Sequence, residues 1–138
     1  MRYDSNNPFA RILRGELPCV KVSETSSVLA FMDMMPEIDG HVLVVPKEAV
    51  SEIFDLPDEV GAACFQMVNR VATAVRDALK PGGILVAQFN GEAAGQTVPH
   101  VHFHIIPRHA GKELRLHARV VTTIDKIEAV AQRIRAKL

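Results

Sequence analysis

The chain has 138 residues, 48% hydrophobic and 23% charged, which are ordinary values for one soluble globular domain spanning residues 1–138. Its 16 Lys and Arg balance 16 Asp and Glu, and this zero net charge argues against a nucleic-acid partner or an anionic membrane surface. Two cysteines, Cys19 and Cys64, are too few for a disulfide framework and suggest a cytoplasmic location, and no apolar run reaches the roughly 18 residues of a membrane span.

The first third of the chain predicts one short helix and three strands. Residues 8–15 begin with proline, end with glycine and place apolar side chains at helical spacing, which predicts a short helix. Alternation of apolar and polar residues predicts a strand over 20–24, and an apolar run predicts a second strand over 27–32. Residues 33–40 contain proline and glycine and are predicted to turn, and the β-branched run at 41–46 predicts a third strand.

The remainder of the chain predicts a long helix, two more strands and a last helix. Residues 57–80 carry an apolar stripe at helical spacing, with acidic residues near the start that suit the helix dipole. Strands are predicted over 83–89 and 98–107, separated by a glycine-containing loop at 90–97. Apolar residues at helical spacing near 123–137 predict the last helix.

These elements predict an α+β fold. The first three strands are joined by short turns, so we expect them to pair as antiparallel neighbours. The long helix then separates them from the last two strands. We therefore predict an antiparallel five-stranded sheet covered by one long helix, with short N-terminal and C-terminal helices.

Three histidines, His100, His102 and His104, alternate with apolar residues in the strand predicted over 98–107. Because residues i, i+2 and i+4 of a strand share one face, the three imidazoles are predicted to project together while the apolar residues face a core. Three interpretations are open at this point: a polar solvent-facing strand, a metal site, or nucleophilic catalysis.

The glycine-containing loop favours a site for an anion next to these histidines. Gly91 and Gly95 allow backbone N–H groups to approach and wrap an anion, and Gln96 and Thr97 add neutral donors. A short loop of this kind is weak evidence alone, but it directly precedes the histidine segment.

The pattern His-apolar-His-apolar-His-apolar-apolar at 100–106 resembles the histidine triad family of nucleotide hydrolases and transferases. The flanking GQTV before it and Pro107-Arg108 after it strengthen the resemblance, which covers about residues 9–108. The segment FMDMMPEIDGHVLVVPK, with His41 and Lys47, resembles the strand–turn–strand element of that family.

The resemblance implies a homodimer in which two sheets join into one, and a purine nucleotide as substrate. It implies that His102 attacks the α-phosphate and forms a covalent nucleotidyl-histidine, which water then cleaves. His104 would contact phosphate oxygens or assist the leaving group, and His100 would orient the loop and the nucleophile. The second nitrogen of His102 must be fixed, so we expect it to donate to a backbone carbonyl.

The resemblance also implies substrate contacts outside the triad. Gly95, Gln96 and Thr97 would contact the phosphate, with N–H donors that stabilise the transition state. Asp33 would accept hydrogen bonds from the ribose hydroxyls. An apolar slot for the base would be formed by Phe9, Ile12, Phe31 and Met34, for which an ordinary core role is the alternative.

Two positions depart from the family pattern. Asn7 and Ala10 stand where many bacterial relatives place a Cys-x-x-Cys that binds structural zinc with two histidines, so we expect no metal and no cofactor, and a buried, hydrogen-bonded His41. Phe89 stands where relatives often place Asn or Gln to contact the substrate, and the adjacent Asn90 is the candidate replacement.

The sequence does not choose between a nucleoside phosphoramidate and a dinucleoside polyphosphate as substrate. Two other classes of function remain open beside the enzyme. One is a nucleotide-binding sensor with little turnover, with which Phe89 is compatible. The other is a divalent-metal-binding module, whose ligands would be His41, His100, His102 and His104. We interpret His109 and His117 as solvated, and residues 109–122 indicate no role.

Overall fold

The computed structural model describes residues 1–36, 38–112 and 122–138. Their helices and strands are, in chain order, α1 (Pro8–Leu13), β1 (Lys21–Glu24), β2 (Val28–Met32), β3 (Val42–Pro46), α2 (Asp58–Leu79), β4 (Gly83–Ala87), β5 (Phe103–Arg108) and α3 (Ile124–Arg135). Two single-turn 3₁₀ helices, η1 (Ile53–Asp55) and η2 (Glu92–Ala94), lie in the connections before α2 and before β5.

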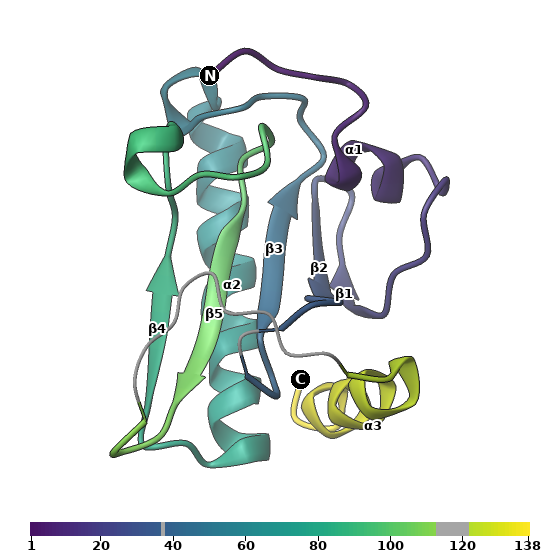
Figure 1. The fold of residues 1–138 in the computed structure, drawn as a ribbon, viewed down its shortest axis with the longest axis vertical. Helices are drawn as coiled ribbons and strands as arrows, with labels where there is room; N and C mark the ends of the chain where they lie inside the picture. Colours follow the sequence, from purple (N-terminus) through teal and green to yellow (C-terminus); the bar gives the residue numbers. More distant parts are fainter. Residues whose placement is uncertain (37, 113–121) are drawn as a thin grey trace.

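The five strands form one antiparallel sheet in the order β1-β2-β3-β5-β4 (Figure 1). This arrangement confirms the predicted α+β fold class. The last strand in the sequence, β5, lies between β3 and β4, and Leu43 of β3 pairs with His104 of β5. The histidine segment is therefore brought to the middle of the sheet.

Local signals explain where the helices begin and end. The side chain of Asn7 accepts a hydrogen bond from the Ala10 N–H and caps α1, and the proline that follows occupies the first turn. Thr123 caps α3 in the same way through the Lys126 N–H. Helix α2 ends at Leu79, and Lys80, which follows it as the C-cap, adopts a left-handed conformation with φ 49°.

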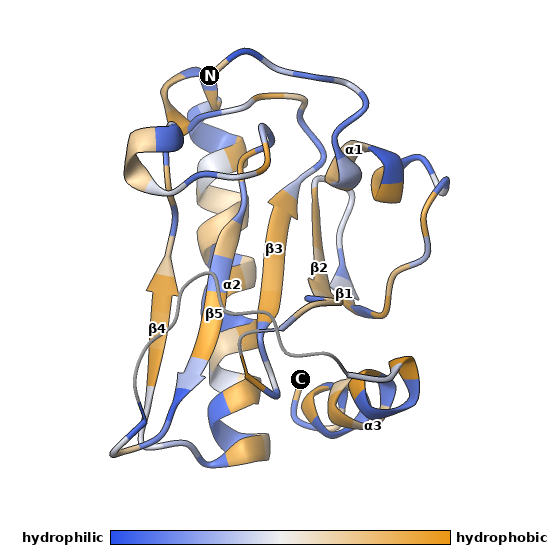
Figure 2. Cartoon of the chain, viewed as in Figure 1, coloured by the Kyte–Doolittle hydropathy of each residue, from blue (hydrophilic) through white to orange (hydrophobic). Residues whose placement is uncertain are grey.

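The two faces of the sheet pack into two separate apolar clusters. On one face, Val42 and Val44 of β3 and Ile105 of β5 pack with the buried residues of α2 and α3. On the other face, Leu43 and Val45 pack with residues of α1 and β2. Strand β3 is apolar along its whole length, whereas helices α2 and α3 alternate apolar and polar stripes (Figure 2). The alternation of β5 thus places His104 on the face of the sheet that α1 covers.

Within the described ranges, no helix combines the length and the hydropathy that crossing a bilayer requires.

The predicted strand over 98–107 differs from the structure at its start. Strand β5 begins only at Phe103, so His100 and His102 precede the sheet ladder. The reason is local: the His100 N–H donates to the Val98 carbonyl and the Val101 N–H donates to the Val50 carbonyl. These bonds draw residues 98–102 out of the sheet, and the three imidazoles do not follow one regular strand face.

Candidate active site

The three histidines of the motif nevertheless lie close together. The ring centroids of His102 and His104 are 5.0 Å apart. The ring of Phe9 from α1 lies edge-on to His102, at 4.9 Å, and to His100, at 6.4 Å. His100 is 0% exposed and His102 is 4% exposed, so both imidazoles are almost completely removed from water.

Both ring nitrogens of His100 are engaged. Its Nε2 lies 2.8 Å from the carbonyl oxygen of Pro46, which only accepts, so this nitrogen carries the proton. Its Nδ1 lies 2.8 Å from the hydroxyl of Tyr3, which is left to donate. Burial lowers the pKa of His100, which keeps this imidazole neutral.

The orientation of His102 is fixed by the backbone of His100. His102 Nδ1 lies 2.7 Å from the carbonyl oxygen of His100, and it must donate its proton to that oxygen. The neutral ring then keeps its lone pair on Nε2. Burial lowers the pKa of His102 to about 4, because desolvation disfavours the charged imidazolium. A buried neutral imidazole with a fixed tautomer is competent to act as a nucleophile at neutral pH.

A chain of polar contacts leads to His104. Its Nδ1 lies 3.0 Å from Nε2 of His41, which is 3% exposed. Nδ1 of His41 lies 3.6 Å from a carboxylate oxygen of Asp33, whose other oxygen accepts from the Met35 N–H at 2.9 Å. Asp33, His41 and His104 therefore form a chain of side chains that leads from the β2–β3 turn into the histidine cluster.

The four residues predicted for the base slot do not all gather in one place. Phe9, Phe31 and Ile12 belong to or pack against the cluster on the α1 face, and the rings of Phe9 and Phe31 are 5.7 Å apart. Met34 packs instead against the cluster beneath α2. Phe9 bridges the apolar cluster and His102, so its ring forms a wall of the site.

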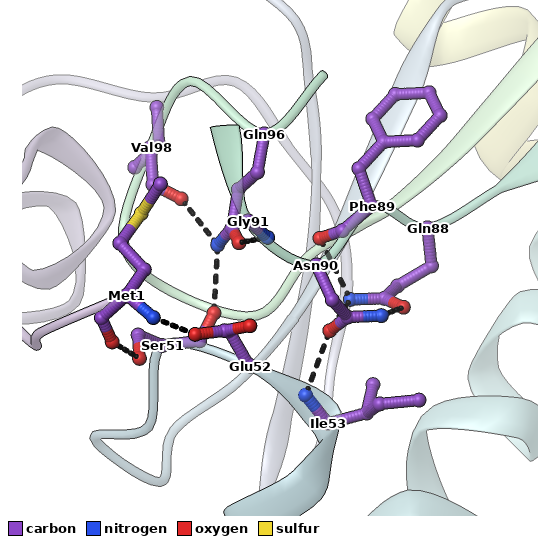
Figure 3. Close-up of polar contacts among 10 residues, drawn as sticks. All are labelled: Met1, Ser51, Glu52, Ile53, Gln88, Phe89, Asn90, Gly91, Gln96 and Val98. Carbon is purple, nitrogen blue, oxygen red and sulfur yellow. Dashed lines mark hydrogen bonds and ion pairs between the residues drawn. The ribbon is translucent and has the colours of Figure 1, made fainter. Parts of the chain in front are cut away.

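The glycine loop is held by the side chain of Gln96 (Figure 3). This side chain is 2% exposed and makes three hydrogen bonds within the chain. Its Nε2 donates to the carbonyls of Ser51, at 2.7 Å, and Val98, at 2.9 Å, and its Oε1 accepts from the Gly91 N–H at 2.7 Å. The structure therefore gives the Gln96 side chain intramolecular partners that close the loop from 91 to 98.

Backbone N–H groups of the same loop form hydrogen bonds within the loop. The N–H groups of Ala94 and Gln96 donate to the Gly91 carbonyl, and the Gly95 N–H donates to the Glu92 carbonyl. Gly91 and Gly95 have φ of 89° and 100°, which explains why glycine occupies both positions. Thr97 is exposed and lines a shallow hollow beside Gly91.

Phe89 and Asn90 point in different directions (Figure 3). The Phe89 ring lies 5.4 Å from the His104 ring, so it borders the histidine cluster. Asn90 pairs with Gln88 through two side-chain hydrogen bonds and accepts from the Ile53 N–H at 2.9 Å. The side chain that borders the site is thus the phenylalanine, and Asn90 fastens the loop to η1.

No pattern in the sequence indicates a role for Tyr3, the only tyrosine in the chain. Its hydrogen bond with His100 joins residues 97 positions apart, and no local sequence pattern predicts it. The same holds for Ser51 and Glu52, which contact Met1. These residues are found only when the chain is folded.

The fold and this cluster define a small antiparallel α+β protein whose candidate site combines buried neutral imidazoles with a glycine loop. A family model described as HIT domain matches residues 14–111, and the chain therefore belongs to the HIT, or histidine triad, family.

Known relatives and solved structures agree with that assignment. The chain is 44% identical over 100 residues to the adenosine 5'-monophosphoramidase hnt1 of Schizosaccharomyces pombe, covering 72% of each protein. A crystal structure of a Hit-like protein from Bartonella henselae has a TM-score of 0.91 at 44% identity, covering 99% of this chain and 100% of that one. A zinc-bound histidine triad family protein from Mycobacterium smegmatis has a TM-score of 0.84 at 32% identity, covering 96% and 92%.

The residues present here do not fit a zinc ion. Asn7, at one expected cysteine position, uses its side chain to cap α1 and to donate to the Asp4 carbonyl at 2.7 Å. Ala10 offers no ligand atom, and both nitrogens of His100 are engaged by Tyr3 and Pro46. Among the described residues, no three His, Cys, Asp or Glu side chains converge as a metal ion would need.

Proposed function

We propose that this HIT-family protein is a cytosolic nucleotide hydrolase or nucleotidyl transferase, formed by residues 1–138 as one domain. Its substrate is a purine nucleotide derivative, cleaved at the α-phosphate. The observation that carries the proposal is the buried His102, whose Nδ1–H donates to the His100 carbonyl at 2.7 Å and leaves Nε2 with its lone pair. The name of the Schizosaccharomyces pombe relative favours a phosphoramidate as substrate.

The reaction proceeds in two displacements. His102 Nε2 attacks the α-phosphorus, a new N–P bond forms, and the bond from phosphorus to the leaving amine or phosphate breaks. The leaving group takes the electron pair of that bond and a proton. Water then attacks the phosphorus of the nucleotidyl-histidine, a P–O bond forms, and the N–P bond breaks with its electron pair returning to Nε2. The proton that water loses replaces the one given to the leaving group, so the nucleoside monophosphate and the neutral imidazole are released.

Other groups near His102 are assigned to the leaving group and the phosphate. His104 contacts phosphate oxygens or gives the leaving group its proton, and His41 holds the ring of His104 by their 3.0 Å contact. The loop carrying Gly95 and Thr97 lies against the phosphate, and Gln96 places that loop through its internal hydrogen bonds.

The nucleoside is assigned to the α1 face of the site. Phe9, Phe31 and Ile12 would hold the base, since they form one apolar cluster beside His102. Met34 and Asn90 are assigned to the substrate by family resemblance alone, because Met34 packs beneath α2 and Asn90 is engaged with Gln88 and η1. The carboxylate of Asp33 would accept hydrogen bonds from the ribose hydroxyls.

A homodimer would form at the β4 edge of the sheet. Strand β4 is the end strand in the sheet order, and Val86 on it is 47% exposed. Phe65 of α2, beside the same edge, is 69% exposed, and both residues line one apolar hollow between α2 and β4. A second copy pairing there would satisfy the strand edge and cover these side chains.

Mass spectrometry of protein mixed with adenosine phosphoramidate tests the mechanism. The expected result is a nucleotidyl adduct on His102. The His102→Ala variant should form no product while its nucleotide affinity stays within about tenfold of the original. His109→Gln, which changes a histidine outside the cluster, is the control and should keep full activity. Normal turnover by His102→Ala would reject the mechanism.

Light scattering tests the dimer separately. The original protein should have twice the mass of one chain, and Val86→Lys should give a single chain because it places a charge at the β4 edge. Phe54→Lys changes a side chain that is 77% exposed elsewhere, and it should leave the mass unchanged. A monomeric original protein would contradict the proposal.

A further inference from the structure

Tyr3 reaches the histidine cluster from the first residues of the chain. Its hydroxyl lies 2.8 Å from His100 Nδ1, and the two ring centroids are 5.6 Å apart. The opposite nitrogen of His100 donates to the carbonyl of Pro46, at the end of β3. The imidazole of His100 is thus held at both nitrogens, by two segments that are distant in the sequence.

The two hydrogen bonds of the His100 ring affect the orientation of His102, because residues 98–102 lie outside the sheet ladder. Strand pairing therefore does not set the direction of the His100 carbonyl. In this segment the His100 N–H donates to the Val98 carbonyl in a short turn, and the Val101 N–H donates to the Val50 carbonyl. The anchored His100 side chain supplies the additional constraint on the carbonyl that accepts from His102.

We propose that Tyr3 is a positioning residue for the nucleophile, acting through His100. The Tyr3 O–H donates to His100 Nδ1 and selects the tautomer whose Nε2–H donates to Pro46. That tautomer fixes His100, and the His100 carbonyl in turn holds the Nδ1–H of His102. The inference rests on the proposed function, in which His102 Nε2 attacks phosphorus.

The segment that carries Tyr3 is itself fastened to the site. The Met1 ammonium pairs with Glu52, and the Ser51 hydroxyl donates to the Met1 carbonyl. The Ser51 carbonyl accepts from Gln96 of the glycine loop at 2.7 Å. The beginning of the chain and the glycine loop are therefore both attached to Ser51, and Tyr3 is placed against His100 by contacts independent of its own hydroxyl.

The test compares Tyr3→Phe with the original protein. This change removes the hydroxyl and keeps the ring that contacts His100. Nitrogen NMR of ¹⁵N-histidine protein should show one tautomer of His102 in the original and a mixture in Tyr3→Phe. The single-turnover rate of nucleotidyl transfer from adenosine phosphoramidate should fall about tenfold, which corresponds to one buried hydrogen bond of roughly 1.4 kcal/mol. Nucleotide affinity, measured in the His102→Ala background, should not change.

Two further variants complete the design. Ser51→Ala loosens the same segment without altering Tyr3, and it should shift the His102 tautomers in the same direction by a smaller amount. Ser5→Ala removes an exposed hydroxyl near Tyr3 and should have no effect on either measurement. The NMR measurement needs no substrate, so it tests the role of Tyr3 even if the original protein does not cleave adenosine phosphoramidate.

The inference is overturned if Tyr3→Phe leaves the His102 tautomer unchanged, whether or not the rate falls, because a rate loss alone would indicate a merely structural role. An unchanged tautomer with normal turnover in the original protein would reject the role of Tyr3 and leave the proposed function standing.

Discussion

His41 Nε2 lies 3.0 Å from His104 Nδ1, so a buried histidine outside the triad motif shares a hydrogen bond with the last triad histidine. The two residues are 63 positions apart in the chain. They meet because β3, which begins directly after His41, is paired with β5, which contains His104. Asp33, 3.6 Å from the other nitrogen of His41, extends the contact to the β2–β3 turn.

Replacing His41 with leucine should lower kcat/KM for adenosine phosphoramidate by about tenfold, the equivalent of one buried hydrogen bond of roughly 1.4 kcal/mol. The loss should appear mainly in kcat, because the contact positions His104 rather than binding the nucleotide. His41→Gln, whose amide can still contact His104, should recover part of the rate. Equal activity of His41→Leu and the original protein would contradict this role.

Folding stability should decrease as the pH falls from about 6.5 toward about 4. In this window the unfolded chain protonates His102 at its ordinary pKa of 6.5, while the folded protein, in which burial lowers that pKa to about 4, does not. The unfolded state thus binds more protons, and the contribution of His102 to the loss is about 3 kcal/mol. The lowered pKa of His100 acts in the same direction.

Urea unfolding of the original protein and of His102→Gln across this range measures that contribution. The difference between their unfolding free energies should change with pH, and a constant difference would show that His102 titrates normally in the folded state. For the same reason, the neutral fraction of His102 should not limit kcat/KM until the pH approaches 4.

Phe89→Asn should change substrate preference. The Phe89 ring borders His104 and has no hydrogen-bond donor, whereas an asparagine amide there could donate to a charged leaving phosphate. We expect the ratio of kcat/KM for diadenosine tetraphosphate over adenosine phosphoramidate to rise about tenfold, as one hydrogen bond to a charged group would give. Phe89→Leu keeps the position apolar and should leave the ratio unchanged. An unchanged ratio in Phe89→Asn would remove this residue from the determinants of specificity.

Gln96→Ala should destabilise the protein by about 3 kcal/mol, because it leaves two carbonyls and one N–H without their side-chain partner. Chemical denaturation measures the change. Gln66→Ala, on the exposed face of α2, is the matched control and should alter the unfolding free energy by less than about 0.5 kcal/mol. A similar effect of the two substitutions would show that the loop closes without Gln96.

The sequence alone determined the five strands, the long helix and the histidine motif. The alternation around the histidines and the apolar stripe of 57–80 are local patterns that predict a strand and a helix regardless of their tertiary partners. The strand itself begins only at Phe103, after His100 and His102. Family membership followed from the motif and its flanks, and the family match over 14–111 confirms it.

Tertiary structure alone decided the chemistry of the individual histidines. The proton of His100 is placed by Pro46 and Tyr3, the lone pair of His102 by a backbone carbonyl, and the partner of His104 by strand pairing. The irregular backbone before Phe103 and the internal hydrogen bonds of Gln96 are likewise decided only by the tertiary structure. A tautomer and a pKa depend on which atoms lie within about 3 Å and on how much water remains. The partners of His100 and His104 come from segments far away in the chain, and the His100 carbonyl reaches His102 through the irregular backbone before Phe103. The sequence therefore identifies the histidines, and only the fold decides which nitrogen of each carries the proton.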